Sequence, residues 1–332
     1  MTNRLPIVDS FDRTHNALRI SVTDRCNIRC FYCMPEIVQF LPKRDVLTFE
    51  EILRLVQILA AQGVDRIRIT GGEPLVRKDL ATLIGLIKSV PGIKDIALTT
   101  NGILLADQAQ SLRDAGLDRL NVSLDTIDPE VFERITRRKG LDKVLNGIKV
   151  AHAVGFTNIR INAVSMVGIS ETEIVPMAEF CRDNNLELRF IEFMPLDGDE
   201  AWQTNQVLSG DQVREMISRE VGLLVPAERK DLSQPAVDYG YVEGNGSVGF
   251  INSVTQPFCG DCNRMRVTAE GKFRNCLFSG EEWDVRELLR GEATDAEIEA
   301  LIRDCVMDKK AGHGTNDGNF LRPEKAMYQI GG

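Results

Sequence analysis

The stretch ALRISVTDRCNIRCFYC, residues 17–33, decides the fold, because a short strand-like run leads directly into three cysteines. Residues 17–22 alternate apolar and polar side chains, as a half-buried strand does. Cys26, Cys30 and Cys33 follow with the spacing C-x3-C-x2-C, and three such thiolates can bind three irons of a 4Fe–4S cluster. The fourth iron would then stay open, as in catalytic metal sites. A zinc site short of one ligand, or three reduced thiols, are the alternatives.

Six strand-like segments alternate with helical segments up to residue 193. Strands are expected at 17–22, 65–70, 93–99, 118–124, 158–164 and 186–193. Helices are expected at about 49–59, 78–89, 106–115 and 171–183, with further helical segments before residue 154. Such β-α-β units form a parallel sheet. Because six units are fewer than the eight of a closed barrel, the expected fold is α/β, an incomplete and laterally open (β/α)6 barrel resembling a TIM barrel.

Unusual motifs lie at the carboxyl ends of these strands, where the active sites of such barrels are found. Besides the cysteine loop, they are Gly71-Gly72-Glu73-Pro74, Thr99-Thr100-Asn101-Gly102, Ser123-Leu124-Asp125 and Glu192-Phe193-Met194-Pro195. The Gly-Gly pair either lets a ligand approach the backbone or makes a simple tight turn. Four arginines lie on the expected strands, namely Arg19, Arg68, Arg160 and Arg189. They either pair with interior carboxylates such as Glu192 or line a pocket for a polyanion.

The pattern changes after Pro195, where a helix at 210–219, short strands within 237–254 and helices at about 283–290 and 295–307 are expected. A second trio, Cys259, Cys262 and Cys276, has the spacing C-x2-C-x13-C. A hairpin that turns at Glu270-Gly271 would return Cys276 to the other two cysteines. The trio is either a second cluster site or a zinc ribbon. The fourth zinc ligand would then come from His15, His152 or His313.

This organisation predicts three parts: an N-terminal arm at 1–15, the partial barrel at 16–196, and a C-terminal α+β domain at 197–332 that carries the second trio. The composition, with 43% hydrophobic and 27% charged residues, is that of a soluble globular protein. A net charge of −9 argues against a general binder of nucleic acid or of a membrane surface.

A cytoplasmic location is expected, because we find neither a signal peptide at the N-terminus nor a transmembrane run. In that reducing compartment, eight cysteines indicate metal binding or catalysis rather than disulfides. Two of the eight, Cys181 and Cys305, lie in helical patterns and are expected to be buried as small apolar residues.

The motifs together resemble a known family. The C-x3-C-x2-C loop after the first strand, with Gly71-Gly72-Glu73-Pro74 after the second, resembles the radical S-adenosylmethionine (SAM) superfamily. The second trio, the run Asn263-Arg264-Met265-Arg266-Val267 and the terminal Gly331-Gly332 are similar to one family within it. That family is the GTP 3′,8-cyclases, which catalyse the first step of molybdenum-cofactor biosynthesis. The resemblance runs from about Leu18 to the last residue.

The resemblance implies SAM and two 4Fe–4S clusters as cofactors. Cys26, Cys30 and Cys33 would hold the cluster that binds SAM, and Cys259, Cys262 and Cys276 a cluster that binds the guanine base. Residues that match SAM contacts of the family are Tyr32, Gly72, Ser123 and Met194. Residues that match its GTP contacts are Arg19, Arg68, Thr99, Arg160, Arg264, Met265 and Arg266. Residues that match positions supporting catalysis are Arg264, Arg266, Gly331 and Gly332. Position 160 is an arginine where the family more often has a lysine, and the two cations hold phosphate differently.

The implied reaction is a lyase-type radical cyclisation. One electron from the first cluster would split SAM into methionine and a 5′-deoxyadenosyl radical, which would abstract H3′ of GTP. The C3′ radical would attack C8 and lead to (8S)-3′,8-cyclo-7,8-dihydroguanosine 5′-triphosphate. The resemblance also implies a reductant protein, a downstream cyclic pyranopterin monophosphate synthase and a possible homodimer. Alternatives are a peptide-modifying radical SAM enzyme with an auxiliary cluster, or a zinc-binding module without enzymatic activity.

Overall fold

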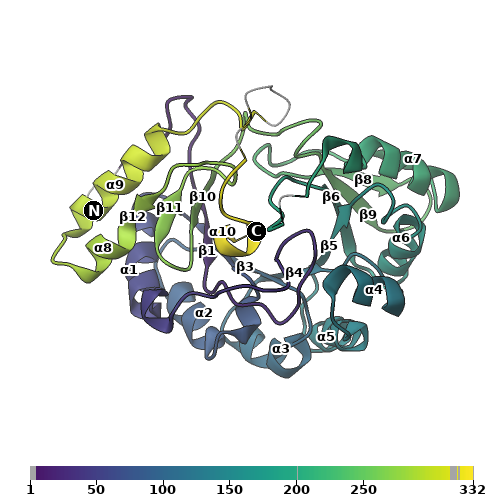
Figure 1. The fold of residues 1–332 in the computed structure, drawn as a ribbon, viewed down its shortest axis with the longest axis horizontal. Helices are drawn as coiled ribbons and strands as arrows, with labels where there is room; N and C mark the ends of the chain where they lie inside the picture. The colour runs from purple at the N-terminus through teal and green to yellow at the C-terminus, as the bar shows by residue number, and fades with distance from the viewer. Residues whose placement is uncertain (1–4, 200, 315–319, 321, 332) are drawn as a thin grey trace.

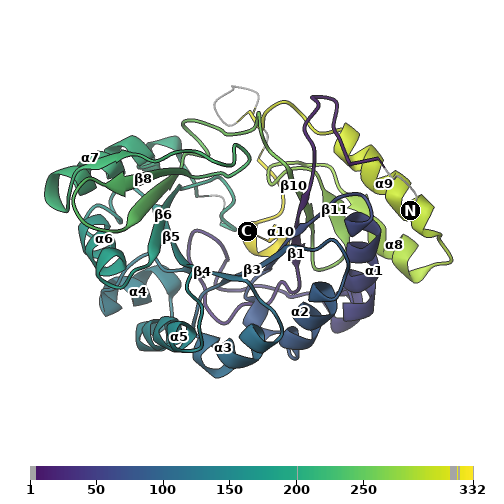
Figure 2. The ribbon, with the colours of Figure 1, turned by 180° about the vertical axis from the view of Figure 1, so that it is seen from behind.

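The computed structural model describes residues 5–199, 201–314, 320 and 322–331, and its strands form one curved sheet (Figure 1). Six parallel strands follow one another in chain order through its middle: β1 (Ala17–Ser21), β2 (Arg66–Thr70), β3 (Asp95–Thr100), β4 (Arg119–Ser123), β5 (Ile159–Ser165) and β6 (Glu187–Glu192). The helices between them are α1 (Phe49–Ala60), α2 (Leu80–Lys88), α3 (Leu105–Asp114), α4 (Pro129–Thr136), α5 (Leu141–Ala153) and α6 (Ile174–Asp183). From both sides, these helices lie along the convex face of the sheet (Figures 1 and 2). The open, incomplete barrel predicted from the sequence is confirmed.

The C-terminal part adds short strands and further helices. Its strands are β7 (Leu224–Pro226), β8 (Val237–Tyr241), β9 (Ser247–Ile251), β10 (Arg264–Val267), β11 (Lys272–Arg274) and β12 (Trp283–Asp284). Its helices are α7 (Gly210–Glu220), α8 (Val285–Arg290), α9 (Asp295–Met307) and α10 (Met327–Ile330). Short 3-10 turns cover Lys43–Asp45, Pro74–Val76 and Thr204–Gln206.

These C-terminal strands continue the barrel sheet instead of forming a sheet of their own. β10 pairs in parallel with β1 at one edge, and β9 pairs in parallel with β6 at the other. Antiparallel strands extend both edges, so that the full order is β12-β11-β10-β1-β2-β3-β4-β5-β6-β9-β8-β7. The two end strands do not pair with each other, so the barrel stays open. The domain boundary at 196–197 stays a prediction, and the sheet is continuous across it.

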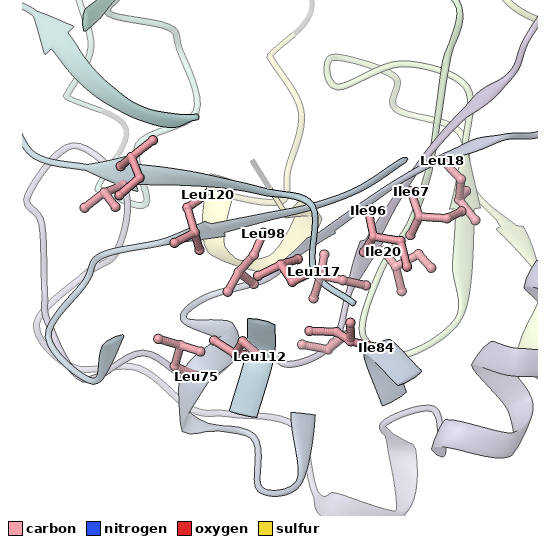
Figure 3. Close-up of a cluster of buried hydrophobic side chains, with 14 of the residues drawn as sticks. Leu18, Ile20, Ile67, Leu75, Ile84, Ile96, Leu98, Leu112, Leu117 and Leu120 are labelled. Carbon is pink, nitrogen blue, oxygen red and sulfur yellow. The ribbon is translucent and has the colours of Figure 1, made fainter. Parts of the chain in front are cut away.

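The main core lies between the sheet and its outer helices (Figure 3). Alternate strand residues point outward, because successive side chains of a strand face opposite sides. The labelled side chains come from β1 to β4, from helices α2 and α3, and from loops: Leu18, Ile20, Ile67, Leu75, Ile84, Ile96, Leu98, Leu112, Leu117 and Leu120. All of them are buried, and each such side chain contributes about 1.5–3 kcal/mol to folding. The remaining strand positions, including Arg19 and Arg68, face the inside of the barrel.

Most predicted local signals are confirmed. The helix expected at about 49–59 is α1, and Thr48 and Glu51 form a capping box at its start, with Glu51 N 3.2 Å from Thr48 Oγ1. β10 and β11 form the expected hairpin, and Cys181 and Cys305 are buried. Helix α10 was not predicted, because four residues are too few to show a periodic pattern. No helix of the described residues is long and apolar enough to cross a bilayer.

Candidate active site

One cavity on the inner side of the sheet is lined by both cysteine trios. It encloses about 1910 Å³ of space between atoms, with its open mouth included. Two cysteine groups that lie far apart in the sequence therefore face the same space.

The first trio lies on the loop after β1. The backbone amides of Cys33 and Met34 each donate to Cys30 O at 3.0 Å, which closes the loop as a tight turn. Burial raises the pKa of Cys26 to about 11 and that of Cys33 to about 12. Such thiols stay protonated at neutral pH unless a metal binds them, because a coordinating metal deprotonates a thiol outright.

The donor set of both trios fits a 4Fe–4S cluster. Cysteine sulfur is the usual ligand of these clusters, and each cysteine binds its own iron, so the sulfurs need not converge on one point. Within the described ranges, no group of three His, Cys, Asp or Glu side chains is arranged to hold a single metal ion. Of the three histidines, His313 lines the cavity, whereas His15 hydrogen-bonds Asp9 in the N-terminal arm. Three cysteine sulfurs at each site therefore fit the cluster interpretation.

The Gly71-Gly72-Glu73-Pro74 motif packs directly against the cysteine loop. Gly72 N donates to Thr23 O at 2.7 Å, and Glu73 N donates to Arg25 O at 2.8 Å. A Cβ atom on Gly72 would lie 2.5 Å from Arg25 O, closer than real Cβ atoms come. Glycine is therefore required here for close backbone approach, and burial raises the pKa of the neighbouring Glu73 carboxyl to about 7.

All four residues expected to contact SAM, namely Tyr32, Gly72, Ser123 and Met194, line the cavity. Tyr32 also ties the cysteine loop to the end of β4, because its hydroxyl donates to Asp125 Oδ2 at 2.7 Å. The other carboxylate oxygen of Asp125 accepts from Val164 N at 2.8 Å. Burial raises the pKa of Asp125 to about 6. The predicted site residues omitted Asp125, although the motif that ends β4 contains it.

Three arginines form a row across adjacent strands. The pairing register places Arg19 of β1 opposite Arg266 of β10 and opposite Arg68 of β2, and all three line the cavity. Burial lowers the pKa of Arg19 and of Arg68, and neighbouring arginines lower them further. In the part of the chain that the structure describes, neither Arg19 nor Arg68 forms a salt bridge. Like charges gathered in a cavity without a protein partner are typical of a site for a polyanion.

Glu192, the proposed interior partner of the arginines, has other partners. Its Oε2 accepts from Val254 N and Thr255 N at 2.8 Å each, and its Oε1 accepts from the Thr255 hydroxyl at 2.5 Å. No arginine salt bridge to Glu192 is present among the described residues, so the polyanion interpretation is favoured. Thr99 also lines the cavity, and its buried Oγ1 has no hydrogen-bond partner among the residues that the structure describes.

Two residues expected to contact GTP do not line the cavity. Arg160 forms an ion pair with Glu187 on the adjacent strand and is not part of the cavity lining. Met265 is fully buried in the main core, because it alternates with the two arginines that face inward. Arg189 of β6, which was left out of the expected GTP contacts, does line the cavity. The roles of Arg160 and Met265 toward GTP stay predictions.

The second trio has a more cationic environment than the first. Arg264 Nη2 lies 3.1 Å and Lys309 Nζ lies 3.4 Å from Cys262 Sγ. Burial opposes ionisation, but these two cations lower the pKa of Cys262 to about 6. The Arg264 guanidinium also lies over the Phe258 ring, 4.7 Å from its centroid. Lys309 belongs to no sequence motif, so it could not be identified as a site residue from the sequence alone.

The C-terminal segment reaches the same cavity. Met327 and Tyr328 of α10 line it, and Arg266 Nη1 donates to Gly331 O at 2.5 Å. In Figure 1, this yellow segment lies within the curve of the sheet. Gly331 has a φ of +84°, a backbone conformation that favours glycine. Gly332, which was also expected to support catalysis, lies outside the described residues.

Comparison with known proteins extends this description. Residues 20–181 match the radical SAM superfamily, and residues 186–315 match the family described as Molybdenum Cofactor Synthesis C. The GTP 3′,8-cyclase of Rhodopirellula baltica is 50% identical over 336 residues, covering 100% of this chain and 94% of the relative. The GTP 3′,8-cyclase of Peptoclostridium acidaminophilum is 42% identical and covers 100% of both chains.

Two solved structures share the fold at low sequence identity. Streptococcus suis SuiB bound to S-adenosylmethionine has a TM-score of 0.62 at 17% identity, covering 94% of this chain and 76% of that one. The enzyme anSMEcpe with bound AdoMet has a TM-score of 0.59 at 15% identity, covering 93% and 89%. These likenesses show the architecture, whereas the full-length relatives show the family. The chain belongs to the GTP 3′,8-cyclase family of the radical SAM superfamily.

Proposed function

We propose that this enzyme cleaves SAM reductively and converts GTP to (8S)-3′,8-cyclo-7,8-dihydroguanosine 5′-triphosphate, the first step of molybdenum-cofactor biosynthesis. The observation that carries this proposal is the single cavity lined by two cysteine trios and a row of arginines. Relatives named GTP 3′,8-cyclase at 50% and 42% identity support GTP as the substrate.

The two trios would each hold a 4Fe–4S cluster, the first through Cys26, Cys30 and Cys33, the second through Cys259, Cys262 and Cys276. When bound, the first cluster would supply the electron for reductive cleavage of SAM, and the second would bind the guanine base. Gly72, Ser123 and Met194 would position SAM beside the first trio. The hydrogen bond from Tyr32 to Asp125 would keep the cysteine loop in place at the end of β4.

The arginine row would bind the triphosphate. Arg19, Arg68 and Arg266 face the cavity from three adjacent strands, and guanidinium groups bind phosphate oxygens in bidentate fashion. A phosphate anchored there would orient the ribose for loss of H3′ and for closure of the bond from C3′ to C8. Helix α10 and Gly331 would help exclude water, which protects a radical from side reactions.

The remaining partners follow from this chemistry. A reductant protein must supply electrons at low potential, and a cyclic pyranopterin monophosphate synthase would consume the product. We also infer a cytoplasmic location, because free cysteines that serve as metal ligands suit a reducing compartment. A homodimer is a further proposal, to be tested by measuring the mass of the protein in solution.

The test is anaerobic incubation of the reconstituted chain with GTP, SAM and dithionite. We expect about eight irons per chain, 5′-deoxyadenosine and a cyclised nucleotide. Cys276→Ala should abolish the cyclised product, whereas Cys305→Ala, which alters a buried cysteine outside the cavity, should retain it. Absence of both products from the native chain would contradict the proposal.

A peptide-modifying activity is less well supported. SuiB, solved in complex with its precursor peptide SuiA, shares only 16% identity with this chain, so it shows the fold alone. The cysteines outside the two trios are Cys181 and Cys305, and both are buried away from the cavity. Among the described residues, no cysteine besides the two trios therefore lines the cavity.

A further inference from the structure

A buried lysine beside the second trio has no role in the function proposed above. Lys309 follows α9 and is only 5% exposed. Its Nζ donates to Cys262 Sγ at 3.4 Å and to Arg264 O at 2.9 Å. Within the described residues it forms no salt bridge with a carboxylate. Because an ammonium has only donors and is rarely buried without an anionic partner, the sulfur site is the partner that the geometry offers.

The two trios differ in their hydrogen-bond donors. Cys262 Sγ accepts from Lys309 and from both Nε (3.4 Å) and Nη2 (3.1 Å) of Arg264. The first trio has a neutral donor instead, the Asn101 side-chain amide, 3.8 Å from Cys26 Sγ. Among the described residues, no lysine or arginine donates to a sulfur of the first trio. Cationic donors are thus specific to the second trio.

The N-terminal arm holds this lysine in place. Arg13 Nη1 donates to Cys259 O at 2.8 Å and to Ala311 O at 3.1 Å, while Nη2 donates to Lys310 O at 2.8 Å. Asp9 fixes the guanidinium from behind, with its Oδ2 2.7 Å from Arg13 Nε. Arg13 therefore fastens the backbone just after Lys309 to the loop that carries the second trio.

We propose that Lys309 is a positioning residue of the second cluster, and that its ammonium on Cys262 Sγ raises the reduction potential of that cluster. A charged N–H donor on a ligand sulfur stabilises the more negative, reduced state, and hydrogen bonds to the sulfurs are among the factors that set such potentials. This inference rests on the proposed function, because it requires a cluster at Cys259, Cys262 and Cys276.

The experiment is a redox titration of the reconstituted full chain, followed by electron paramagnetic resonance. Signals of the two clusters are assigned with variants that lack one trio. In Lys309→Met, we expect the potential of the second cluster to shift to a lower value and that of the first to stay unchanged. Lys310→Met is the matched control, since it removes the same charge from the adjacent, exposed side chain and should leave both potentials unchanged.

Two further variants keep the test decisive if Lys309→Met fails to retain its second cluster. Lys309→Arg keeps a charged donor and should keep the native potential, whereas Lys309→Gln keeps only a neutral donor and should lower it. A native potential in Lys309→Met or Lys309→Gln, with both clusters present, overturns the role of Lys309. Iron for a single cluster in the native chain would instead overturn the two-cluster function, and this proposal with it.

Discussion

Arg68 and Arg160 were both expected to contact GTP, yet they differ in their protein partners. Arg68 faces the cavity without a salt bridge among the described residues, whereas Arg160 is paired with Glu187. The Arg160 charge still lies near enough to contribute to lowering the pKa of Arg68. Arg160→Ala is therefore expected to weaken GTP binding through the loss of charge, and by less than the loss of Arg68.

Arg68→Ala should raise the KM for GTP about 10- to 100-fold, since a charge-assisted hydrogen bond contributes about 1.5–3 kcal/mol. Cleavage of SAM without GTP should stay near the native rate, because Arg68 is not among the expected SAM contacts. Steady-state kinetics with both readouts checks this. Arg66→Ala, on the same strand but half-exposed and paired with Asp231, is the control. An unchanged KM in Arg68→Ala would remove that residue from the GTP site.

His15 makes stability depend on pH. Burial, followed by the nearby Lys309, lowers its pKa to about 4, although its hydrogen bond to Asp9 opposes this. Between that value and the ordinary 6.5, the unfolded chain binds a proton that the folded chain does not. This contribution to the free energy of unfolding should therefore rise by about 1–2 kcal/mol from pH 5 to pH 6.5. Chemical denaturation at several pH values in this range gives the free energy of unfolding at each pH. That free energy should rise less steeply with pH in His15→Gln than in the native chain. An equal rise in both proteins would contradict the role of His15.

At the scale of elements, the hairpin of β10 and β11 brings Cys276 back to the second trio. Its turn requires glycine at position 271, where φ is +79° and a Cβ would lie 2.7 Å from Arg286 Cβ. Gly271→Ala should destabilise the chain by about 1–3 kcal/mol and lower the iron content of the second site. Denaturation and iron analysis check this. Gly280→Ala, where a Cβ meets nothing within 4 Å, should behave as native.

Most helices and strands could be predicted because the residues that mark them are close together in the sequence. The capping box before α1, the alternation in β1 and the turn at Gly271 each depend on neighbours in sequence. The edges of the sheet could not be predicted in this way. β9 and β10 read only as short strands, and their pairing with β6 and β1 depends on contacts between residues far apart in the chain.

The site was predicted in the same uneven way. Both trios and the cavity-facing arginines have motifs or strand positions that reveal them. Lys309 follows a helix and belongs to no motif, so only the fold places it beside Cys262. Asp125 stands in a motif, but its hydrogen bond with Tyr32 depends on the fold. Arg160 is the opposite example. Its position matches a GTP contact of the family, but its side chain forms an ion pair with Glu187 on the neighbouring strand.

At the scale of the whole molecule, the C-terminal segment is fastened across the cavity by ion pairs. Arg322 Nη2 lies 2.8 Å from Asp197 Oδ1, and Lys325 Nζ lies 2.7 Å from Glu282 Oε2. Each pair contributes about 0.5–1 kcal/mol, so removing both should raise the open-to-closed ratio about 5- to 30-fold. These pairs therefore anchor the segment whose Met327 and Tyr328 line the cavity.

The double variant Arg322→Ala/Lys325→Ala should form more 5′-deoxyadenosine per cyclised nucleotide, because an open cavity admits water and lets the radical be lost. Quantifying both products in one reaction gives the ratio. Arg219→Ala, which breaks an exposed pair with Glu220 on α7, should leave it unchanged. A native ratio in the double variant would mean that these anchors do not close the cavity.

The continuous sheet also determines the order in which strands can pair while the chain is being synthesised. β1 leaves the ribosome before the other strands of this sheet, yet β10, its neighbour on one side, is translated only after the six central strands. One long edge of β1 therefore stays unpaired through most of translation, which calls for protection against aggregation. The first cysteine loop can meet the Gly72 motif once β2 exists, whereas the second site needs Arg13 and Lys309 from opposite ends of the chain. The first cluster site can therefore form before the second, so the two clusters of one cavity would be inserted at different stages of folding.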